Sequence, residues 1–424
     1  MKTKAIQEHN YYSSLLSKCL ILTIPPQEFR ITPSQMEPII QTRFLIVSDT
    51  HGKEFINEGG LPDCDVAIHC GDLTDGSKLE EFRTTLEQMK LIKAPLKLVI
   101  AGNHDFTMDT PAFERKVADA AQPLVPELVA QEYGVPGRAR ELFEEAKDAG
   151  IVFLDEGTYH FNLANGAQLN VYASPYTPSM GQWGFQYHPN KGHEFAIDQG
   201  IDIAITHGPP KGIMDYTYGR ERAGCPDLFS AIVNARPRLH CFGHIHEGWG
   251  ARLVTWKDDI EQPTHFTAID NHRSPIIEKL ADLREGRYDS EEDAMVKRRK
   301  LEALSKDKCS KTSHCSGDEH ALHYGKQTLF VNAAVETNED FEQRPWLIDL
   351  ELPRRTSSER ANEEREGEPK IKSSLNKQKA NKTQDRVHKS NTKIVESERR
   401  RRWTQIGEKL KDYMYGGLGD EAKR

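Results

Sequence analysis

The sequence predicts an α/β domain in which buried strands alternate with helices. Five short apolar runs, rich in Val and Ile, each end in a cluster of small or polar residues, and such runs are typical of strands buried on both faces. These runs span residues 44–48, 65–70, 96–101, 201–206 and 238–242. Segments of helical periodicity at 78–89, 112–120 and 138–149 lie between strands, as in layered α/β proteins.

The predicted domain spans residues 43–353 and follows an N-terminal extension, residues 1–42, that has little periodic pattern. Later apolar runs at 251–256, 328–333 and 346–350 predict further strands of the same domain. In open α/β sheets, functional groups gather beyond the carboxyl ends of the strands. The polar residues that follow the five early runs are therefore the candidates for a site.

Two polar segments interrupt or follow this domain. Residues 257–326 have little apolar content and one predicted helix at 291–305, so we expect a surface insertion that is mobile rather than packed. Residues 354–424 are rich in Ser, Lys, Arg, Glu and Asn and contain almost no aromatic residue before Trp403. We expect this segment to be a disordered tail with one helix near 404–413.

The net charge of −8 combines an acidic body with a basic tail. Residues 354–424 carry 20 Lys and Arg against 12 Asp and Glu, a net charge of +8, which leaves −16 for residues 1–353. An acidic body that handles phosphate needs cations, because bare carboxylates repel the substrate. In the tail, Arg399–Arg402 fit a nuclear-import or nucleic-acid patch, although the interleaved acids favour a solvated segment.

The cysteines and the apolar runs indicate the compartment. Seven cysteines, scattered and odd in number, are typical of reduced thiols in an intracellular protein. No run reaches the ~18 apolar residues of a membrane span. Lys18 precedes the short apolar stretch at 19–24 and Pro25 ends it, which makes a poor signal peptide. We expect a cytoplasmic protein with no membrane partner, and the basic tail leaves the nucleus open.

Metal-ligand side chains stand where five predicted strands give way to loops. Residues i and i+2 of an extended segment point the same way, so Asp49 with His51, and His244 with His246, can each face one centre. Neighbouring glycines allow tight turns and close backbone approach. Nitrogen and oxygen ligands without thiolate favour Mn, Fe, Zn, Co or Ni over Ca or Mg alone. The five fragments are DTH at 49–51, GD at 71–72, GNHD at 102–105, THG at 206–208 and GHIH at 243–246.

These five fragments, in this order, resemble the calcineurin-like metallophosphoesterase superfamily, whose pattern is D-x-H, GD, GNH[ED], H and GHxH. The resemblance covers residues 43–255 with a closing strand near 328–350, and it implies a four-layer α/β/β/α sandwich. A narrower resemblance is to the metallophosphoesterase-domain subfamily of mammalian brain and fungi, which is similar to class III cyclic nucleotide phosphodiesterases. The segments that support it are THGPP at 206–210, GHIHEGWG at 243–250 and LFVNAA at 329–334.

The resemblance implies two divalent metal ions, such as Mn, Fe or Zn, ~3.5–4 Å apart and bridged by Asp72. One ion would be held by Asp49, His51, Asp72 and His246. The other would be held by Asp72, Asn103, His207 and His244. A metal-bound hydroxide would attack phosphorus, while His104 stabilises the transition state or protonates the leaving oxygen and Asp105 orients the imidazole. Some members of the narrower group have lost the last histidine of GHxH and hydrolyse slowly, whereas this chain keeps His246.

We therefore expect a phosphoesterase that acts on small phosphomono- or phosphodiesters, with a cyclic nucleotide as the leading substrate. An alternative is a regulatory protein that binds a nucleotide or a partner with little turnover. A nuclease would need a basic groove, which the acidic body disfavours, so we expect no nucleic-acid partner. A protein phosphatase is also disfavoured, because Gly71–Gly76 lacks the arginine of the Asp-Arg-Gly segment that clamps a phosphoryl group.

Other groups of chemically interesting residues have two interpretations. The aromatic residues of the loop at 174–187 either stack a nucleobase beside the metals or pack onto the domain. They are Tyr176, Trp183, Phe185 and Tyr187. A Cys and His cluster in the insertion has a spacing that fits no standard zinc finger, so we interpret it as incidental. It comprises Cys309, His314, Cys315, His320 and His323. His69 and His240 lie inside predicted strands and are interpreted as core residues. The sequence specifies no protein partner for the insertion or the tail.

Overall fold

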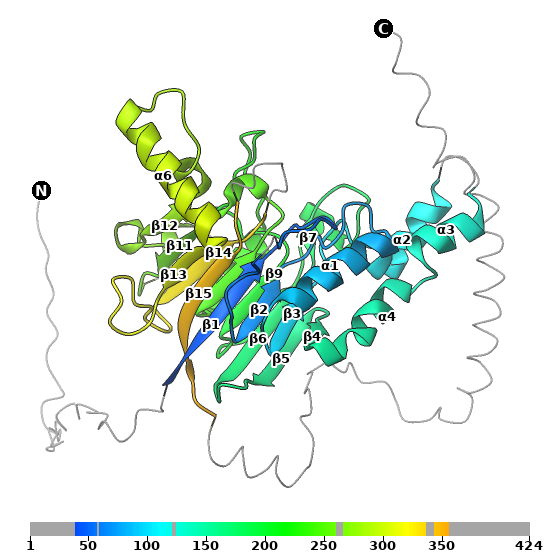
Figure 1. Cartoon of the computed structure of the whole chain (residues 1–424), viewed down its shortest axis with the longest axis horizontal. Helices are drawn as coiled ribbons and strands as arrows, with labels where there is room; N and C mark the ends of the chain where they lie inside the picture. Colours follow the sequence, from blue (N-terminus) through cyan, green and yellow to red (C-terminus); the bar gives the residue numbers. More distant parts are fainter. Residues whose placement is uncertain (1–38, 57–58, 121–123, 260–265, 336–342, 356–424) are drawn as a thin grey trace, which may run out of the picture. The chain divides into compact units, whose positions relative to one another are not determined.

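The computed structural model describes residues 39–56, 59–120, 124–259, 266–335 and 343–355 (Figure 1). All of them belong to one unit of the chain, which begins at Pro38. The expected helix at 404–413 and the basic run Arg399–Arg402 lie outside the described residues, as does all of the expected tail beyond Arg355. The same holds for residues 1–38 of the expected N-terminal extension, whereas residues 39–42 begin the first strand.

The first sheet has six strands in the order β13-β15-β1-β2-β3-β4. Its strands β1, β2, β3 and β4 run parallel to one another, so their carboxyl ends lie at the same edge. β15 pairs antiparallel with β1, and β13 pairs parallel with β15. The strands span Ile39–Val47 (β1), Val66–His69 (β2), Leu96–Val99 (β3), Ile151–Phe153 (β4), Ser310–Ser313 (β13) and Trp346–Pro353 (β15).

The second sheet has seven strands in the order β12-β11-β14-β10-β9-β6-β5. Its centre, β14, β10, β9 and β6, is parallel, and β11 and β5 flank it in the antiparallel direction. The strands span Gly157–Asn162 (β5), Gln168–Ser174 (β6), Ile203–Thr206 (β9), Leu239–Phe242 (β10), Gly250–Thr255 (β11), Ile276–Lys279 (β12) and Gln327–Asn332 (β14). A two-stranded ribbon adds Thr177–Pro178 (β7) and Gln186–Tyr187 (β8).

The two sheets pack face to face, and helices cover their outer faces. On β1, Phe44 and Ile46 face the second sheet, whereas Leu45 and Val47 face the helices, as the period of two in a strand requires. Helices α1 (Leu79–Leu91) and α4 (Arg138–Glu145) pack on the first sheet (Figure 1). Helix α5 (Pro226–Ala235) packs on the second sheet. The predicted α/β/β/α class is therefore confirmed.

The remaining helices lie outside the central layers. They are α2 (Thr110–Ala118), α3 (Pro126–Tyr133) and α6 (Glu291–Asp307), where the sequence predicted 112–120 for α2 and 291–305 for α6. Short 3₁₀ helices span Phe106–Met108, Lys147–Ala149, Pro189–Lys191, His246–Gly248, Phe266–Ala268, Asn271–Arg273 and Leu280–Asp282. Within the described part of the chain, no helix combines the length and the apolar character needed to cross a bilayer.

The expected mobile insertion at 257–326 is packed where the structure describes it. It supplies one edge strand to each sheet, β12 and β13, and it buries Leu280 and Leu283 in the core between the sheets. A capping box starts α6, because the Ser290 hydroxyl accepts a hydrogen bond from the Asp293 N–H at 3.1 Å and the Asp293 carboxylate accepts one from the Ser290 N–H at 3.1 Å. The segment is thus part of the domain rather than an addition to its surface.

Candidate metal centre

Asp49, His51 and His246 form one group of potential metal ligands, with donor atoms all within 4.8 Å of one another. The Nε2 atoms of His51 and His246 are 3.4 Å apart, and His246 Nε2 lies 3.4 Å from Asp49 Oδ1. Two ligands bound ~2.1 Å from one metal are roughly 3–3.5 Å apart at tetrahedral or octahedral angles. The observed spacing therefore fits donor atoms arranged around a single cation.

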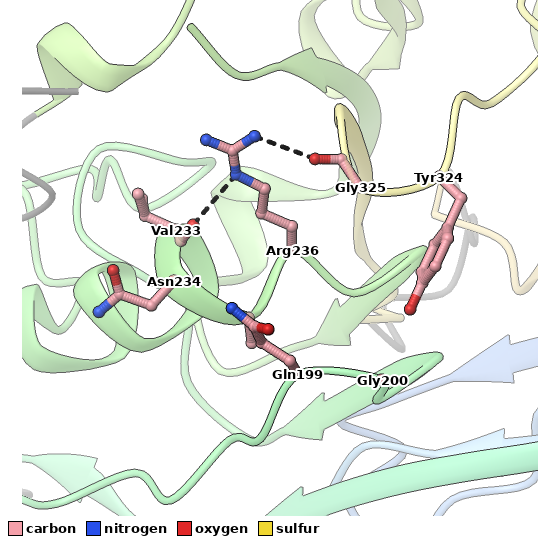
Figure 2. A pocket seen from close by; sticks show the side chains of 8 residues that line it. Gln199, Gly200, Val233, Asn234, Arg236, Tyr324 and Gly325 are labelled. Atoms are coloured by element: carbon pink, nitrogen blue, oxygen red, sulfur yellow. Dashed lines mark hydrogen bonds between the residues drawn. The ribbon is translucent and has the colours of Figure 1, made fainter. Parts of the chain in front are cut away.

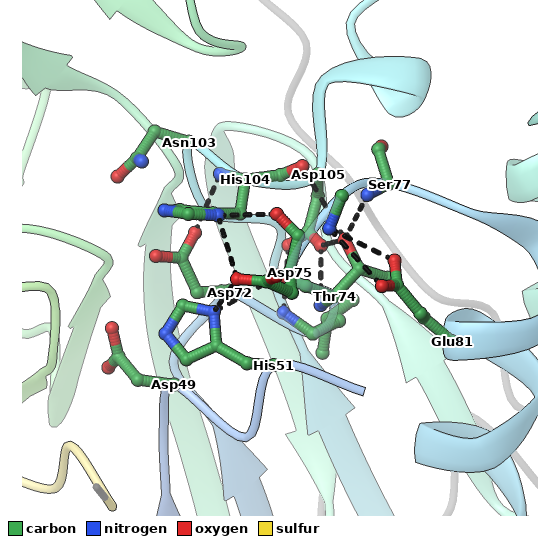
Figure 3. Close-up of polar contacts among 12 residues, drawn as sticks. Asp49, His51, Asp72, Thr74, Asp75, Ser77, Glu81, Asn103, His104 and Asp105 are labelled. Carbon is green, nitrogen blue, oxygen red and sulfur yellow. Dashed lines mark hydrogen bonds and ion pairs between the residues drawn. The ribbon is translucent and has the colours of Figure 1, made fainter. Parts of the chain in front are cut away.

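Asp72, His207 and His244 form a second group, again with donor atoms within 4.8 Å. His207 Nε2 lies 3.2 Å from Asp72 Oδ2 and 3.0 Å from the amide oxygen of Asn103. The rings of His207 and His244 contact each other with centroids 4.9 Å apart. The structure thus brings together all seven side chains that the sequence proposed as ligands, and Figure 3 shows His51 and Asp72 between Asp49 and Asn103.

The buried His207 is held with one nitrogen aimed at the centre. Its Nδ1 lies 3.0 Å from the carbonyl oxygen of Cys70 and donates to it, which leaves Nε2 facing the Asp72 and Asn103 oxygens. A carbonyl that fixes the ring in this way is a common second partner of metal-bound histidines. Burial by itself lowers the pKa of His207, but the Asp72 carboxylate outweighs it and raises that pKa to about 9. A cation would take the place of that extra proton.

The carboxylate of Asp49 is fully buried yet favours its charged form. Burial raises its pKa, but the hydrogen bond to His246 and the neighbouring imidazoles dominate and hold the pKa below its usual value. Both carboxylate oxygens also lie 3.0 Å from the backbone N–H of His244, which donates to them. Asp49 therefore ties the loop after β1 to the loop after β10 as well as offering a ligand atom.

Backbone strain is concentrated at this centre. Among the described residues ten other than glycine have a positive φ, and four of these are proposed ligands. The four are Asp49 (57°), His51 (49°), Asp72 (51°) and His244 (67°). Left-handed conformations cost about 1–3 kcal/mol for such residues and persist only where the surroundings enforce them, typically at functional sites. The chain here bends away from each strand end so that the ligand side chain turns inward.

Two glycines of the fragments are required by close approach. A Cβ at Gly102 would overlap the backbone nitrogen and Oδ1 of Asp72, and a Cβ at Gly243 would overlap the carboxylate of Asp49. Any larger residue would displace a ligand carboxylate. Close packing therefore requires glycine before Asn103 and before His244, in addition to any requirement of the turn geometry.

His104 borders the centre, as expected, but Asp105 does not orient it. The imidazole Nδ1 donates to the backbone carbonyl of Asp75 at 2.6 Å, and the ring meets that of His51 edge to face at 4.8 Å. The Asp105 carboxylate is fully buried and accepts hydrogen bonds from Gly102 N, Leu73 N, Thr74 N and the Thr74 hydroxyl at 2.7–3.0 Å. Asp105 therefore joins the loops after β2 and β3, because its side chain points away from the neighbouring histidine (Figure 3).

Asp75 is a residue that the sequence interpretation missed. Its carbonyl holds His104, and its exposed carboxylate lies 3.8 Å from His51 Nδ1 and 3.9 Å from His104 Nδ1. These three side chains make a further group of potential metal ligands at the rim of the centre. The available signal was a second carboxylate three residues after Asp72, in the same loop.

The aromatic loop at 174–187 divides between the two interpretations. Trp183 stacks on the His104 ring with centroids 4.3 Å apart and keeps 37% of its surface exposed. The ammonium of Lys116 lies 4.6 Å from the Trp183 ring. Phe185 is buried in the core beneath the first sheet, and Tyr176, like Tyr187, packs against His193. Only Trp183 of the four borders the metal centre.

The two histidines interpreted as core residues are fully buried and support the ligands from behind. His69 Nε2 contacts the hydroxyl of Thr50 at 2.9 Å, between two proposed ligands, and His240 Nε2 contacts Thr206 at 2.8 Å, one residue before His207. Burial lowers the pKa of each imidazole to about 3. Both therefore stay neutral and act through hydrogen bonds.

The Cys and His cluster of the insertion forms no ligand group among the described residues. His314 instead bonds to its own turn. Its Nδ1 donates to the His320 carbonyl at 2.7 Å, and its Nε2 lies 3.0 Å from the Thr312 hydroxyl. These bonds fix the turn after β13. They give the ring a structural role.

A cavity of about 500 Å³ lies at the opposite end of the second sheet (Figure 2). Arg236, which ends α5 before β10, lines it together with Gln199 and Tyr324. The Arg236 guanidinium donates to the carbonyls of Val233 and Gly325, so it closes the end of the helix. This cavity is thus remote from the proposed ligands His244 and His246, which follow the carboxyl end of β10.

Comparison with known proteins identifies the family. The family model of the calcineurin-like phosphoesterases matches residues 42–248 of the sequence. Human metallophosphoesterase domain-containing protein 1 is 32% identical over 222 residues, which cover 49% of this chain and 62% of that protein. A UPF0046 protein of Caenorhabditis elegans is 30% identical over 228 residues, covering 53% and 69%. The probable rhamnogalacturonate lyase C of Emericella nidulans is 32% identical over 217 residues, covering 50% of this chain and 18% of that one.

The chain therefore spans less than two thirds of the human and fungal relatives. The matched region ends at residue 248, just after the last fragment of the ligand pattern. It includes all seven proposed metal ligands. The chain belongs to the calcineurin-like metallophosphoesterase superfamily, in the group of metallophosphoesterase domain-containing protein 1 and the UPF0046 proteins.

Proposed function

We propose that this protein is a metal-dependent hydrolase of small phosphoric esters. The observation that carries the proposal is that two groups of three potential ligands meet at the carboxyl ends of the parallel strands of both sheets. Two divalent cations bound there would supply Lewis-acid activation of the phosphoryl group and of a water molecule. The donor set of imidazole, carboxylate and amide suits Mn, Fe or Zn.

Two bound cations would divide the proposed ligands between them and share Asp72. The first set is Asp49, His51, Asp72 and His246, and the second is Asp72, Asn103, His207 and His244. The position of Asp72 supports the shared role. Its Oδ2 lies beside His207 of the second set, and its charge opposes the lowering by burial of the pKa of His51 in the first set, so Asp72 lies close to both sets.

We assign His104 to the leaving group. Since its Nδ1 donates to the Asp75 carbonyl, the second proton of the imidazolium form would sit on Nε2, which could donate it to a phosphoryl or leaving oxygen and end as the neutral ring. Contacts with His51 on one side and Trp183 on another restrict the ring. His104 therefore works from a fixed position without needing Asp105.

The substrate that the site suits best is a phosphodiester with an aromatic group, such as a cyclic nucleotide. Trp183 keeps 37% of its surface exposed beside His104 and Lys116, and a base can stack against the exposed part of its ring. Lys116 places a positive charge at the same ring, which favours an anionic ester over a neutral one. Esters without an aromatic group lack the first of these contacts.

A hydrolysis assay with metal replacement tests the proposal. The full-length protein is stripped with EDTA and assayed on bis(p-nitrophenyl) phosphate, p-nitrophenyl phosphate and cyclic nucleotides, with Mn²⁺, Fe²⁺ or Zn²⁺ restored in turn. Activity should vanish on chelation, return with a cation, and fall by at least about 100-fold in Asp72→Asn or His104→Ala. The matched control is Asp63→Asn, at an exposed residue paired with Lys93.

Two outcomes count against the proposal in different ways. No metal-dependent turnover on any ester would refute it. Tight nucleotide binding by calorimetry without turnover would instead support the alternative of a nucleotide-binding regulatory protein.

A further inference from the structure

A second cavity, of about 550 Å³, lies on the outer face of the seven-stranded sheet and shares no lining residue with the metal centre. We call it the basic cavity, defined by Lys211, Arg222, Phe229, Arg252, Phe266 and Asn271 among the residues that line it. None of its lining residues is Asp or Glu. Its volume lies in the range of roughly 300–1,000 Å³ that small-molecule sites occupy.

Arg252 reaches this cavity because of its place in β11. Its neighbours Ala251 and Leu253 pack between the two sheets, so the Arg252 side chain points to the opposite face. Val254, two residues further on, packs on that same outer face with α5.

The Arg252 guanidinium has no carboxylate partner in the described part of the chain. Its one hydrogen bond there is to the amide oxygen of Asn271, at 2.8 Å, and its Nε is buried with no acceptor. Burial lowers the pKa of Arg252. A charge taken from water without a counter-charge is costly. A bound anion in contact with the guanidinium would offset that cost.

Two further cations line the same cavity. Lys211 is exposed and makes no ion pair among the described residues, and Arg222 is paired through one nitrogen with Asp215 at 2.7 Å. Pro226, at the amino end of the ten-residue helix α5, also lines the cavity, and the dipole of a helix favours negative charge at that end. These groups all favour an anion over a cation or a neutral ligand.

The apolar part of the lining points to a ligand larger than an inorganic anion. Phe229 is buried beneath the cavity, and Phe266 keeps 58% of its surface exposed at its edge. An exposed aromatic residue next to three cations suits a ligand with an aromatic or apolar body and one charged end.

We propose that the basic cavity binds a small organic anion, with a phosphate or carboxylate head on Arg252 and an apolar body against Phe266. The site is separate from the metal centre and uses no metal. It nevertheless shares a loop with it, because Lys211 and Arg222 follow His207 in the chain and Tyr218 of that loop donates its N–H to Glu247, next to His246, at 2.6 Å.

Titration calorimetry on the full-length, EDTA-treated protein tests the proposal at low salt. The probes are phenyl phosphate, benzoate and inorganic phosphate. Phenyl phosphate or benzoate should bind at one site per chain, and whichever binds more tightly identifies the head group. Arg252→Gln should weaken that binding by about tenfold or more, and Lys211→Ala by a few-fold. Arg138→Gln, a matched change in an exposed ion pair of α4, should leave it unchanged.

Further arms separate this site from the metal centre. Asp72→Asn should retain the binding, so the result does not depend on whether the chain hydrolyses esters. Circular dichroism melting checks that Arg252→Gln is folded, and the exposed Lys211 variant keeps the test valid if it is not. Equal affinity in the wild type and both cavity variants would overturn the proposal. So would the absence of binding by every probe, or inorganic phosphate binding as tightly as phenyl phosphate.

Discussion

Replacement of Asp105 by Asn distinguishes two roles for this carboxylate. Asp105 Oδ2 accepts from the backbone N–H groups of Leu73 and Gly102, at 3.0 and 2.8 Å, and Oδ1 accepts from the N–H and hydroxyl of Thr74, at 3.0 and 2.7 Å. An asparagine has one oxygen where aspartate has two. The NH₂ group of the asparagine would turn toward the Thr74 hydroxyl and donate to it. The hydroxyl can then donate its own proton to the His104 carbonyl, 3.4 Å away.

The expected cost follows from counting the groups left without partners. In Asp105→Asn, the buried N–H of Thr74 loses its acceptor, which costs about 1–3 kcal/mol. In Asp105→Ala, three backbone N–H groups lose theirs, and with partial relaxation of the loops we expect about 3–5 kcal/mol. Domains have ~5–15 kcal/mol in total, so the second variant approaches the limit of folding.

Urea unfolding and the pH dependence of kcat measure the two roles separately. If Asp105 joins the loops, Asp105→Asn should lower the unfolding free energy and the activity together, without moving the pH profile of kcat. Asp63→Asn, an exposed control, should change neither. A variant with unchanged stability, within about 0.5 kcal/mol, but with a displaced acidic or basic limb of the profile would refute this reasoning, since it would mean that Asp105 acts on His104 after all.

Three further predictions follow from other contacts. Trp183→Ala should raise KM for nucleoside esters by about tenfold, because base stacking is worth ~1–3 kcal/mol, and leave KM for alkyl esters nearly unchanged; Tyr288→Ala, at a residue 91% exposed, is the control. Gly102→Ala should reduce the metal content found by elemental analysis, because the new Cβ would overlap the Asp72 carboxylate, whereas Gly219→Ala should retain the metal. His240, with its pKa lowered to about 3, contributes stability that is present above the unfolded pKa of ~6.5 and is lost as the pH falls below it, at about 1.4 kcal/mol per pH unit. Urea unfolding at pH 6.5 and 5 should therefore show a shallower loss for His240→Gln; an equal loss would contradict the buried neutral state.

The strands that end in ligands could be predicted because they are buried on both faces. All four residues of β2, β9 and β10 are buried, and such runs stand out in any hydropathy pattern. The missed strands β4, β5, β12 and β13 lie at sheet edges, where a strand pairs on one side only and needs little apolar content. The internal strand β6 was also missed, although most of its residues are buried. Periodicity reports burial, so elements at the margin of the sheets leave a weak pattern.

The side chains of the centre could be placed from the sequence only where a strand fixes their direction. Asp49, Asp72 and His207 each follow a buried strand closely, so their place at the sheet edge follows from the topology. The family resemblance implied that Asp105 orients the neighbouring His104, yet the turn sends the two side chains in different directions. The contact between Trp183 and His104 joins segments nearly 80 residues apart, so it depends on tertiary packing. The roles of the seven ligands, the domain limits and the cellular compartment stay predictions.

The division of the ligands between the sheets explains why so much strain is tolerated. Asp49, Asp72 and Asn103 follow strands of the first sheet, whereas His207 and His244 follow strands of the second. The sheets also meet here through backbone hydrogen bonds, since Ser48 donates its N–H to the Ala333 carbonyl at 2.9 Å and Val335 donates to the Ser48 carbonyl at 2.9 Å. Four left-handed residues would relax if either sheet could move alone. Packing of the shared core prevents that movement, so the ligand geometry is held by the whole sandwich rather than by the loops themselves.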